Sequence, residues 1–499
     1  MYIRNEDTIC APATVPGTGA ISVIRVSGPE ALTVADKVIS CRKGNISSAK
    51  GYTLKFGFIY NRPNDYISSN YNNLPKEEIL DEVLVSIFKA PHSYTGENSV
   101  EISCHASSYI VTEIMNQLYD AGARAAEPGE FTQRAFLNGK MDLAQAEAVA
   151  DVIASQNAAA HRIAFNQMKG GFSSELREMR GELLELVSLM ELELDFSEEE
   201  VEFADRSRLD GLLVALTDHI TRLIDSFKLG NAIKNGVPVA IAGATNTGKS
   251  TLLNALLGEE RAIVSDVHGT TRDTVEETLN IDGILFRFID TAGLRETDEI
   301  VEKIGIERTF KKISEASIVL GMVDLTRDEQ STCETVSEIV SKVDFSTQKL
   351  VFLLNKTDIC PLNKNVTLLN NIVSLIEKEG VKTSVVNSCE EAAEIVPIVP
   401  ISAKSGSGIE ILRSVLACSQ RDLLSDCDTT LVTNQRHVQA LADARTSLLR
   451  VRDGLASGLP TDLAAQDIRE AIYHLGSIVG EISTDEVLGN IFRNFCIGK

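Results

Sequence analysis

An octapeptide in the middle of the chain, Gly243-Ala-Thr-Asn-Thr-Gly-Lys-Ser250, constrains the fold more than any other feature. The apolar run before it, 239–242, is typical of a strand, and the run after it, 251–257, is typical of a helix. In a phosphate loop, glycines let backbone N–H groups close around phosphates at a helix N-terminus. The lysine then reaches the β- and γ-phosphates and the serine hydroxyl ligates Mg²⁺. A chance glycine-rich turn is the alternative, but the strand–loop–helix context favours a phosphate loop.

Three further motifs follow in a fixed order. Asp290-Thr-Ala-Gly293 ends a predicted strand, where an aspartate can hold Mg²⁺ through water and a glycine N–H can sense the γ-phosphate. Asn355-Lys-Thr-Asp358 ends another strand, and the Asp358 carboxylate can accept two hydrogen bonds from a guanine edge, which adenine cannot offer. Ser402-Ala-Lys404 completes a base-binding loop. Together with the phosphate loop, these motifs predict a GTPase.

The residue after Asp290-Thr-Ala-Gly293 bears on how the attacking water is oriented. Ras-like enzymes have a glutamine there, whereas this chain has Leu294, which has no polar group. Catalysis therefore needs another residue, another cation or a partner. Asn246 is a candidate ligand for an extra cation, and Thr271 in the expected switch loop is placed to ligate Mg²⁺. The acidic stretch 296–302 is either a solvated segment or the source of a catalytic carboxylate.

The regions flanking these motifs have different sequence textures. Strands alternate with helical segments through 237–420, which predicts a parallel sheet with crossover helices. Helical patterns occupy about 131–231 and 434–482, and the N-terminal residues mix short β-rich runs with turn clusters. The expected fold class is α/β and α. A phosphate-loop domain (236–421) is inserted into an all-helical domain (122–235 and 422–499), which follows an α+β N-terminal domain (1–121).

Composition narrows the functional classes. The 499 residues carry 48 basic and 71 acidic side chains, and the resulting charge of −23 argues against an extended basic groove that grips nucleic acid unaided. No apolar run reaches the roughly 18 residues of a membrane helix. The nine cysteines contain no Cys-x-x-Cys pair, so neither a disulfide framework nor a zinc ribbon is indicated. We expect a reduced, soluble, cytoplasmic chain.

Longer runs allow a comparison with a known family. The runs 269–273 and 290–305 in the central domain, Arg25-Val-Ser-Gly28, Ser93-Tyr-Thr-Gly-Glu97 and 128–147 before it, and Phe495-Cys-Ile-Gly-Lys499 at the end resemble the MnmE (TrmE) family of tRNA modification GTPases. The match is poor over 43–78, 325–349 and much of 359–397. Thr245 stands where the family generally has proline, and Cys104-His-Ala-Ser107 replaces a His-Gly-Gly run.

The resemblance implies a specific reaction. Family members act with the FAD-dependent partner MnmG to add a carboxymethylaminomethyl-type group to carbon 5 of the wobble uridine (position 34) of certain tRNAs. The one-carbon unit comes from 5-formyl- or methylene-tetrahydrofolate, and GTP hydrolysis drives the cycle. The resemblance also implies a homodimer formed through the N-terminal domain. Bound K⁺ is expected to supply the positive charge that Ras takes from an arginine finger, with two G domains meeting face to face.

The resemblance assigns roles to individual residues. It implies K⁺ ligation by Asn246, Ser265, Val267 and Thr270, Mg²⁺ ligation by Ser250 and Thr271, positioning of the attacking water by Glu302, and folate binding by Arg25, Glu101, Lys140 and Lys499. Arginine and lysine suit the glutamate carboxylates of folate, and a glutamate can accept hydrogen bonds from its pterin ring. The expected GTP-binding residues are Asn246, Thr247, Gly248, Lys249, Ser250, Thr251, Ser265, Asp266, Val267, His268, Gly269, Thr270, Thr271, Asp290, Thr291, Ala292, Gly293, Asn355, Lys356, Asp358, Ser402, Ala403 and Lys404.

The sequence is compatible with several roles for Cys496. Its place four residues from the end is that of a prenylated cysteine, but Ile-Gly-Lys is not an accepted prenylation ending. A buried structural thiol is one alternative, and the resemblance favours a thiol that takes part in the uridine chemistry, where a thiolate acts as nucleophile. The rival functional class is a non-catalytic GTPase switch of the ribosome-assembly type, which needs neither the folate-site residues nor this cysteine. A structural helical scaffold with an inactive G domain is a third interpretation.

Overall fold

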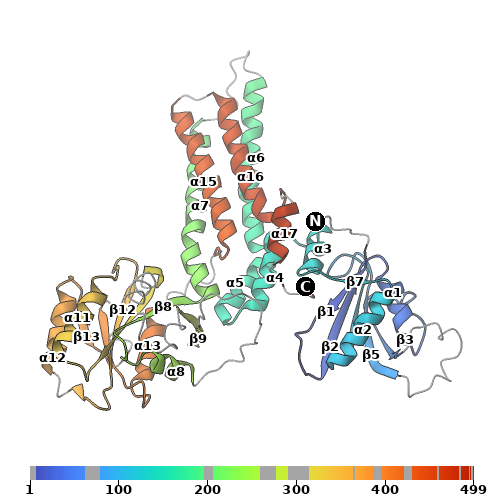
Figure 1. The fold of residues 1–499 in the computed structure, drawn as a ribbon. Helices are drawn as coiled ribbons and strands as arrows, with labels where there is room; N and C mark the ends of the chain where they lie inside the picture. Colours follow the sequence, from blue (N-terminus) through green and yellow to red (C-terminus); the bar gives the residue numbers. More distant parts are fainter. Residues whose placement is uncertain are drawn as a thin grey trace. The chain divides into compact units, whose positions relative to one another are not determined.

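The computed structural model describes residues 7–61, 79–195, 206–258, 277–289, 314–362, 366–386, 388, 395–420, 430–457, 460–482, 485–493, 495 and 498. The chain divides into two compact units (Figure 1). The first comprises Met1–Ala154, Ala164–Asp218 and Gln439–Lys499, and the second comprises Ser155–Ile163 and His219–Val438. The main segment of the second unit, His219–Val438, therefore lies in the sequence between two segments of the first unit.

A seven-stranded sheet organises the N-terminal part of the first unit. Its elements are β1 (Ile9–Pro12), β2 (Ile21–Ser27), α1 (Ala31–Val38), β3 (Ser40–Cys41), β4 (Thr53–Tyr60), β5 (Ile79–Phe88), β6 (Ser99–His105), α2 (Ser108–Asp120) and β7 (Arg124–Ala125). The strand order is β3-β4-β5-β6-β2-β1-β7, and only the β1–β7 pair is parallel. Apolar residues of α1 and α2 pack on one face. By the strand register, the exposed side chains of Ile21, Leu54, Phe56 and Leu84 share the other face.

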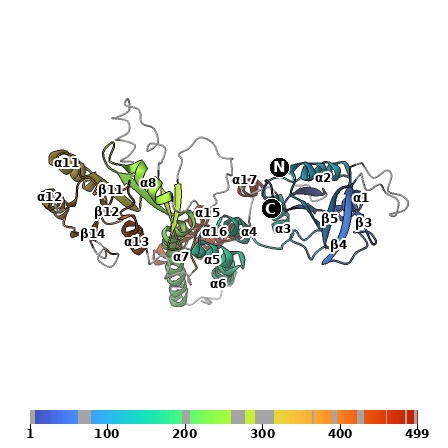
Figure 2. The same cartoon turned by 90° about the horizontal axis from the view of Figure 1, so that it is seen from below.

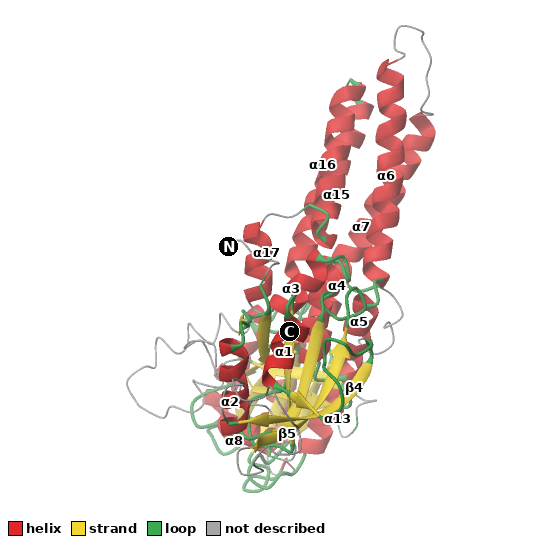
Figure 3. Ribbon diagram, turned by 90° about the vertical axis from the view of Figure 1, so that its right-hand side faces the viewer, coloured by secondary structure: helices red, strands yellow, loops and turns green. Residues whose placement is uncertain are grey.

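Helices form the rest of the first unit. They are α3 (Glu130–Leu137), α4 (Leu143–Ala154), α5 (Ala158–Met168), α6 (Gly171–Asp195), α7 (Arg206–Asn235), α15 (Gln435–Ala456), α16 (Thr461–Val479) and α17 (Asp485–Arg493), and α5, α7 and α15 cross between the units. The long helices α6 and α16 lie side by side (Figure 3). On α6, Leu176, Met179, Leu183 and Met190 are buried at helical spacing, which explains the contact. None of the described helices combines the length and apolarity that a membrane span needs.

The second unit is built on another seven-stranded sheet (Figure 2). Its elements are β8 (Val237–Ala242), α8 (Lys249–Leu257), β9 (Glu277–Ile281), β10 (Ile284–Phe288), β11 (Ile318–Asp324), α11 (Glu329–Val340), β12 (Lys349–Asn355), α12 (Val366–Glu377), β13 (Thr383–Val385), β14 (Val396–Pro400) and α13 (Ile409–Ser419). The strand order is β13-β14-β12-β11-β8-β10-β9. Helices α8 and α13 contribute to the core on one face, and α11 and α12 to the core on the other.

The predicted fold class is confirmed by this arrangement: an α+β N-terminal part, helices, and an inserted α/β part with crossover helices. Among the described strands, the sheet differs from the predicted parallel one at β9, which pairs antiparallel with β10. The hairpin turn between them is Asp282-Gly283, both with positive φ (51° and 85°), which matches the twist of a two-residue hairpin. Of the stretch 43–78, which matches the family poorly, residues 62–78 lie outside the described residues.

Candidate functional site

The phosphate-loop sequence folds as a tight connection from β8 to α8. A Cβ at Gly243 would lie 2.5 Å from the Met322 carbonyl oxygen of β11, and a Cβ at Gly248 would lie 2.5 Å from Asn355 Nδ2 at the end of β12. Only glycine therefore fits at these two positions. Helix α8 begins at Lys249, directly after Gly248. Because the first N–H groups of a helix have no intrahelical acceptors, this end of α8 favours an anion.

Lys249 lies inside the loop rather than in solvent. Its Nζ donates to the carbonyl oxygens of Gly243 and Ala244, both at 2.8 Å. Burial lowers the pKa of Lys249, and the positive charge of Arg327 lowers it further. The Thr247 hydroxyl also donates to the Ala244 carbonyl oxygen, at 2.9 Å. The loop is thus held by side chains that bind its own carbonyls.

Asn355 joins the phosphate loop to the expected base-binding loops. Its side-chain Nδ2 donates to the Thr247 carbonyl oxygen at 2.8 Å, and its Oδ1 accepts from the Ala403 N–H at 3.0 Å. The Ser402 hydroxyl donates to Asp358 Oδ1 at 2.8 Å. Three of the motifs predicted from sequence therefore meet at one edge of the sheet, at the carboxyl ends of β8, β12 and β14.

Lys356 is held by an aspartate that the motif analysis did not include. Its backbone is left-handed (φ 68°), and its Nζ lies 2.6 Å from Asp324 Oδ2 at the end of β11. Burial by itself raises the pKa of Asp324, but the hydrogen bonds from Lys356 and Thr326 outweigh burial and hold this pKa below its usual value. Asp324 is therefore an anion that positions Lys356. An acidic residue at the end of a predicted strand was the available sequence signal.

Many predicted nucleotide and metal residues lie outside the described part of the chain. These are residues 265–271 and 290–293, and Leu294 and the expected water-positioning residue Glu302 also lie outside it. Of the expected cation ligands, Asn246 and Ser250 are described, and Asn246 has a left-handed backbone (φ 61°). Within the described ranges, no group of three or more His, Cys, Asp or Glu side chains could hold a metal ion.

A second cluster lies on the N-terminal sheet. Arg25 of β2 and Glu101 of β6 face each other in the strand register, and the Arg25 Nε and Nη2 donate to Glu101 Oε1 at 3.0 and 2.8 Å. The Arg25 guanidinium carbon lies 5.1 Å from the ring centroid of Tyr94 and 5.7 Å from that of Phe131. Lys140 donates to the carbonyl oxygen of Pro91 at 3.1 Å, near the segment that carries Tyr94. The structure thus brings the three described folate-site candidates to one region.

The two aromatic residues of this cluster were not singled out from sequence. The only sequence feature that pointed to Tyr94 and Phe131 was that they lie in the runs 93–97 and 128–140, which carry the family resemblance. Beside them, the fully buried Arg134 pairs with Glu97 at 3.1 Å and with Glu130 at 3.0 Å. This ion-pair network joins α3 to the segment that carries Tyr94, and no local sequence pattern predicted it.

The chain end approaches the same sheet. A Cβ on Gly498 would overlap the carbonyl oxygen of Pro12 in β1, the strand that pairs with the Arg25 strand. Cys496 and Lys499 themselves lie outside the described residues. Of the described cysteines, Cys104 is buried, and burial raises its pKa to about 11. Cys104 is therefore a neutral thiol near pH 7 and is unsuited to be a nucleophile.

Comparison with known proteins covers nearly the whole chain. The family model for the MnmE helical domain matches residues 143–496, and that for the GTP-binding protein TrmE N-terminus matches residues 8–140. A relative from Bacteroides thetaiotaomicron, named tRNA modification GTPase MnmE, is 50% identical over 99% of this chain and 100% of its own length. Relatives of the same name from Parabacteroides distasonis and Flavobacterium johnsoniae are 49% and 48% identical over 99% of this chain and 100% of their own lengths. With its phosphate loop, its inserted α/β part and these matches, the chain belongs to the MnmE family.

Proposed function

We propose that this chain hydrolyses GTP and takes part in the modification of tRNA. The observation that carries the proposal is the hydrogen-bonded junction made by Asn355, which links the phosphate loop to Ser402-Ala-Lys404. It occurs in a chain that is 50% identical, over 99% of its length, to a relative named tRNA modification GTPase MnmE. We further propose the domain limits 1–121, 122–235, 236–421 and 422–499.

In the nucleotide site, the proposed roles follow the chemistry of the side chains. Lys249 and the N-terminus of α8 bind phosphates, and Asp358 accepts hydrogen bonds from guanine. Mg²⁺, held by Ser250 and Thr271, neutralises charge on the phosphates when bound. Hydroxyl, amide and carbonyl oxygens are ligands that suit hard cations, so the K⁺ set of Asn246, Ser265, Val267 and Thr270 fits such an ion. We assign orientation of the attacking water to Glu302.

The cluster around Arg25 fits a flat, partly anionic ligand such as a folate. The Arg25 and Glu101 side chains are 17% and 28% exposed, so both are partly accessible to a ligand. Both bonds from Arg25 go to Oε1, which leaves the accepting capacity of Glu101 Oε2 for ring N–H donors. Lys140 and Lys499 supply charges for the glutamate carboxylates. A bound tetrahydrofolate supplies the one-carbon unit for the modification.

The full reaction that we propose involves partners. Together with the FAD-dependent protein MnmG, the chain adds a carboxymethylaminomethyl-type group to carbon 5 of uridine 34, and Cys496 acts as a nucleophilic thiol. Because the net charge is −23, we assign much of the tRNA contact to MnmG or to a local basic patch. The exposed apolar sheet face that includes Leu54 and Leu84 supports a homodimer formed through the N-terminal domain. The proposed location is the cytoplasm.

The experiment that tests this proposal compares GTP hydrolysis by the full chain in KCl and in NaCl at equal ionic strength. We expect strong stimulation by potassium, lost in Asn246→Ala. Equal slow rates in both salts would refute the K⁺ site and leave a GTPase that waits for a partner.

A second experiment separates the modification enzyme from a ribosome-assembly switch. Cys496→Ser is expected to abolish tRNA modification in the presence of MnmG while largely preserving GTP hydrolysis. Arg25→Ala is expected to abolish binding of 5-formyltetrahydrofolate. If the wild-type chain binds no folate and supports no tRNA modification with MnmG, the switch interpretation replaces the enzyme. Normal modification by Cys496→Ser would instead refute the proposed role of the cysteine.

A further inference from the structure

Arg327 lies beside the phosphate loop although it belongs to no nucleotide-binding motif. It is in the connection between β11 and α11, three residues after Asp324. Its Nη2 donates to the carbonyl oxygen of Thr245. Lys249 donates to the carbonyl oxygens of Gly243 and Ala244. Two cationic side chains therefore bind three consecutive carbonyls of one loop.

The position of Arg327 is fixed by the fold. Strands β8 and β11 are parallel neighbours, so the connections that leave their carboxyl ends run side by side. The backbone N–H of Arg327 donates to the Asp324 carbonyl oxygen at 3.2 Å, and the Asp324 side chain accepts from the Thr326 N–H at 2.9 Å. These bonds form a tight turn directly after β11. The turn delivers the guanidinium to the phosphate loop.

The electrostatics of this pair point to an anion. Both side chains are cationic and both bind carbonyl oxygens of the same short loop, so their like charges are held close together and repel each other. Within the described part of the chain, neither forms an ion pair with a carboxylate. Two like charges held together next to a helix N-terminus favour a ligand that carries more than one negative charge. A guanidinium has five N–H donors in a planar fork, and the bond to Thr245 uses one.

We propose that Arg327 is a second phosphate-binding residue of the nucleotide site, which contacts the phosphate chain of a guanosine di- or triphosphate together with Lys249. This inference rests on the proposed GTP site and extends it, because none of the four motifs includes position 327. A purely structural function for Arg327, bracing the loop through the Thr245 carbonyl, predicts different behaviour. A brace needs only a hydrogen-bond donor, whereas a phosphate ligand needs the positive charge.

The test is the affinity of the full chain for GMP, GDP and a non-hydrolysable GTP analogue, measured by competition with a fluorescent GDP. Arg327→Gln keeps a polar side chain with N–H donors and removes the charge. We expect this variant to lower the affinity for GDP and for the GTP analogue about 10-fold or more, and the affinity for GMP less than about 2-fold. The reason is that charge-assisted hydrogen bonds are about twice as strong as neutral ones. The loss should shrink as salt is raised, and Arg327→Lys should stay closer to wild type than Arg327→Gln.

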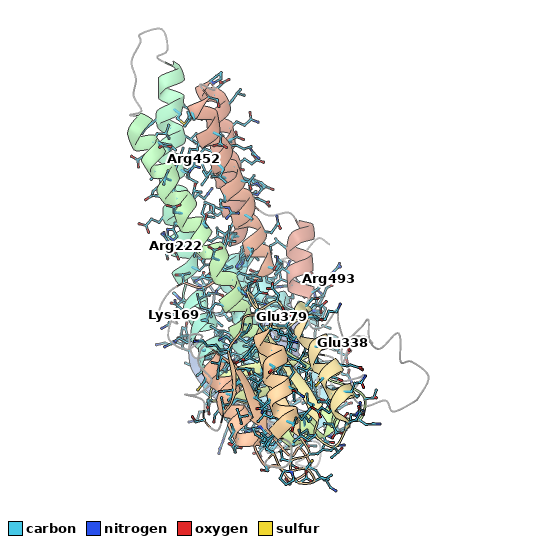
Figure 4. All side chains as sticks on the ribbon, turned by 90° about the vertical axis from the view of Figure 1, so that its left-hand side faces the viewer. Lys169, Arg222, Glu338, Glu379, Arg452 and Arg493 are labelled. Carbon is cyan, nitrogen blue, oxygen red and sulfur yellow. The ribbon has the colours of Figure 1, made fainter. Side chains whose placement is uncertain are left out.

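Lys378→Gln is the matched control. It removes one positive charge from an exposed position just after α12, next to Glu379 (Figure 4), and should leave all three affinities unchanged. Wild-type GDP affinity in Arg327→Gln, or an equal loss for GMP and GDP that does not depend on salt, would overturn the phosphate contact while leaving the GTP site intact. Failure of the wild-type chain to bind any guanine nucleotide would overturn the proposed function as well.

Discussion

Replacing Asn355 by alanine removes one side chain that holds two loops of the nucleotide site together. Asn355 is 3% exposed, and its amide bonds to the Thr247 carbonyl oxygen and to the Ala403 N–H at 2.8 and 3.0 Å. Alanine leaves both of these backbone groups without that partner in a buried location. A buried polar group that loses its partner costs about 1–3 kcal/mol, so we expect the free energy of unfolding of the second unit to fall by about 2–6 kcal/mol.

The same change should weaken nucleotide binding. Once Asn355 no longer joins the phosphate loop to the base loop, the bound nucleotide has to order both loops. If ordering the loops costs about 1.4–3 kcal/mol of the binding free energy, the affinity for GDP falls about 10- to 100-fold.

The stability change is best measured by urea unfolding of the full chain without nucleotide, with hydrogen exchange followed in peptides from β8–α8 and β12. Local exchange is needed because a chain with two compact units need not unfold in one step. The control is Asn370→Ala, an exposed amide on α12, for which we expect a change within about 0.5 kcal/mol. A loss below about 1 kcal/mol for Asn355→Ala would refute the inference that this side chain joins the loops.

Three further predictions concern the first unit. Replacing the fully buried Arg134 by methionine removes this ion pair from Glu97 and leaves Glu130 paired with Arg124, so chemical denaturation should show a loss of about 3–5 kcal/mol; a loss like that of a surface ion pair would contradict this. The hydrogen bond and charge of Asp81 raise the pKa of His105, so this pair stabilises the fold below the ordinary histidine pKa and ceases to do so as pH rises through the raised value. Asp81→Asn should return the His105 pKa toward about 6.5 in an NMR titration, and an unchanged pKa would argue against the pairing. Gly129 has φ 71°, and a Cβ there would lie 2.6 Å from the Phe492 carbonyl oxygen, so Gly129→Ala should speed hydrogen exchange in α17; unaltered exchange would speak against this packing.

The buried strands of the second unit were predictable because their sequences are locally distinctive. In β11, all seven residues from Ile318 to Asp324 are buried, and such continuous apolar runs are typical of parallel strands covered on both faces. The antiparallel β9 was not predicted, although Asp282-Gly283 between two β-rich runs is a strong hairpin signal. The error came from extending the parallel pattern over the whole sheet.

The same distinction between local sequence and strand pairing applies to the candidate sites. The glycines, lysine and hydroxyls of 243–250 lie within one short run, so sequence alone determined that a phosphate loop follows a strand and opens a helix. Which distant residues meet that loop was decided by strand order: β8 lies beside β11, and β11 beside β12, which places Arg327 and Asn355 against it. Likewise, Arg25 meets Glu101 because β2 and β6 pair in one register. Side-chain chemistry is encoded residue by residue, whereas distances between segments remote in sequence exist only once the strands have paired.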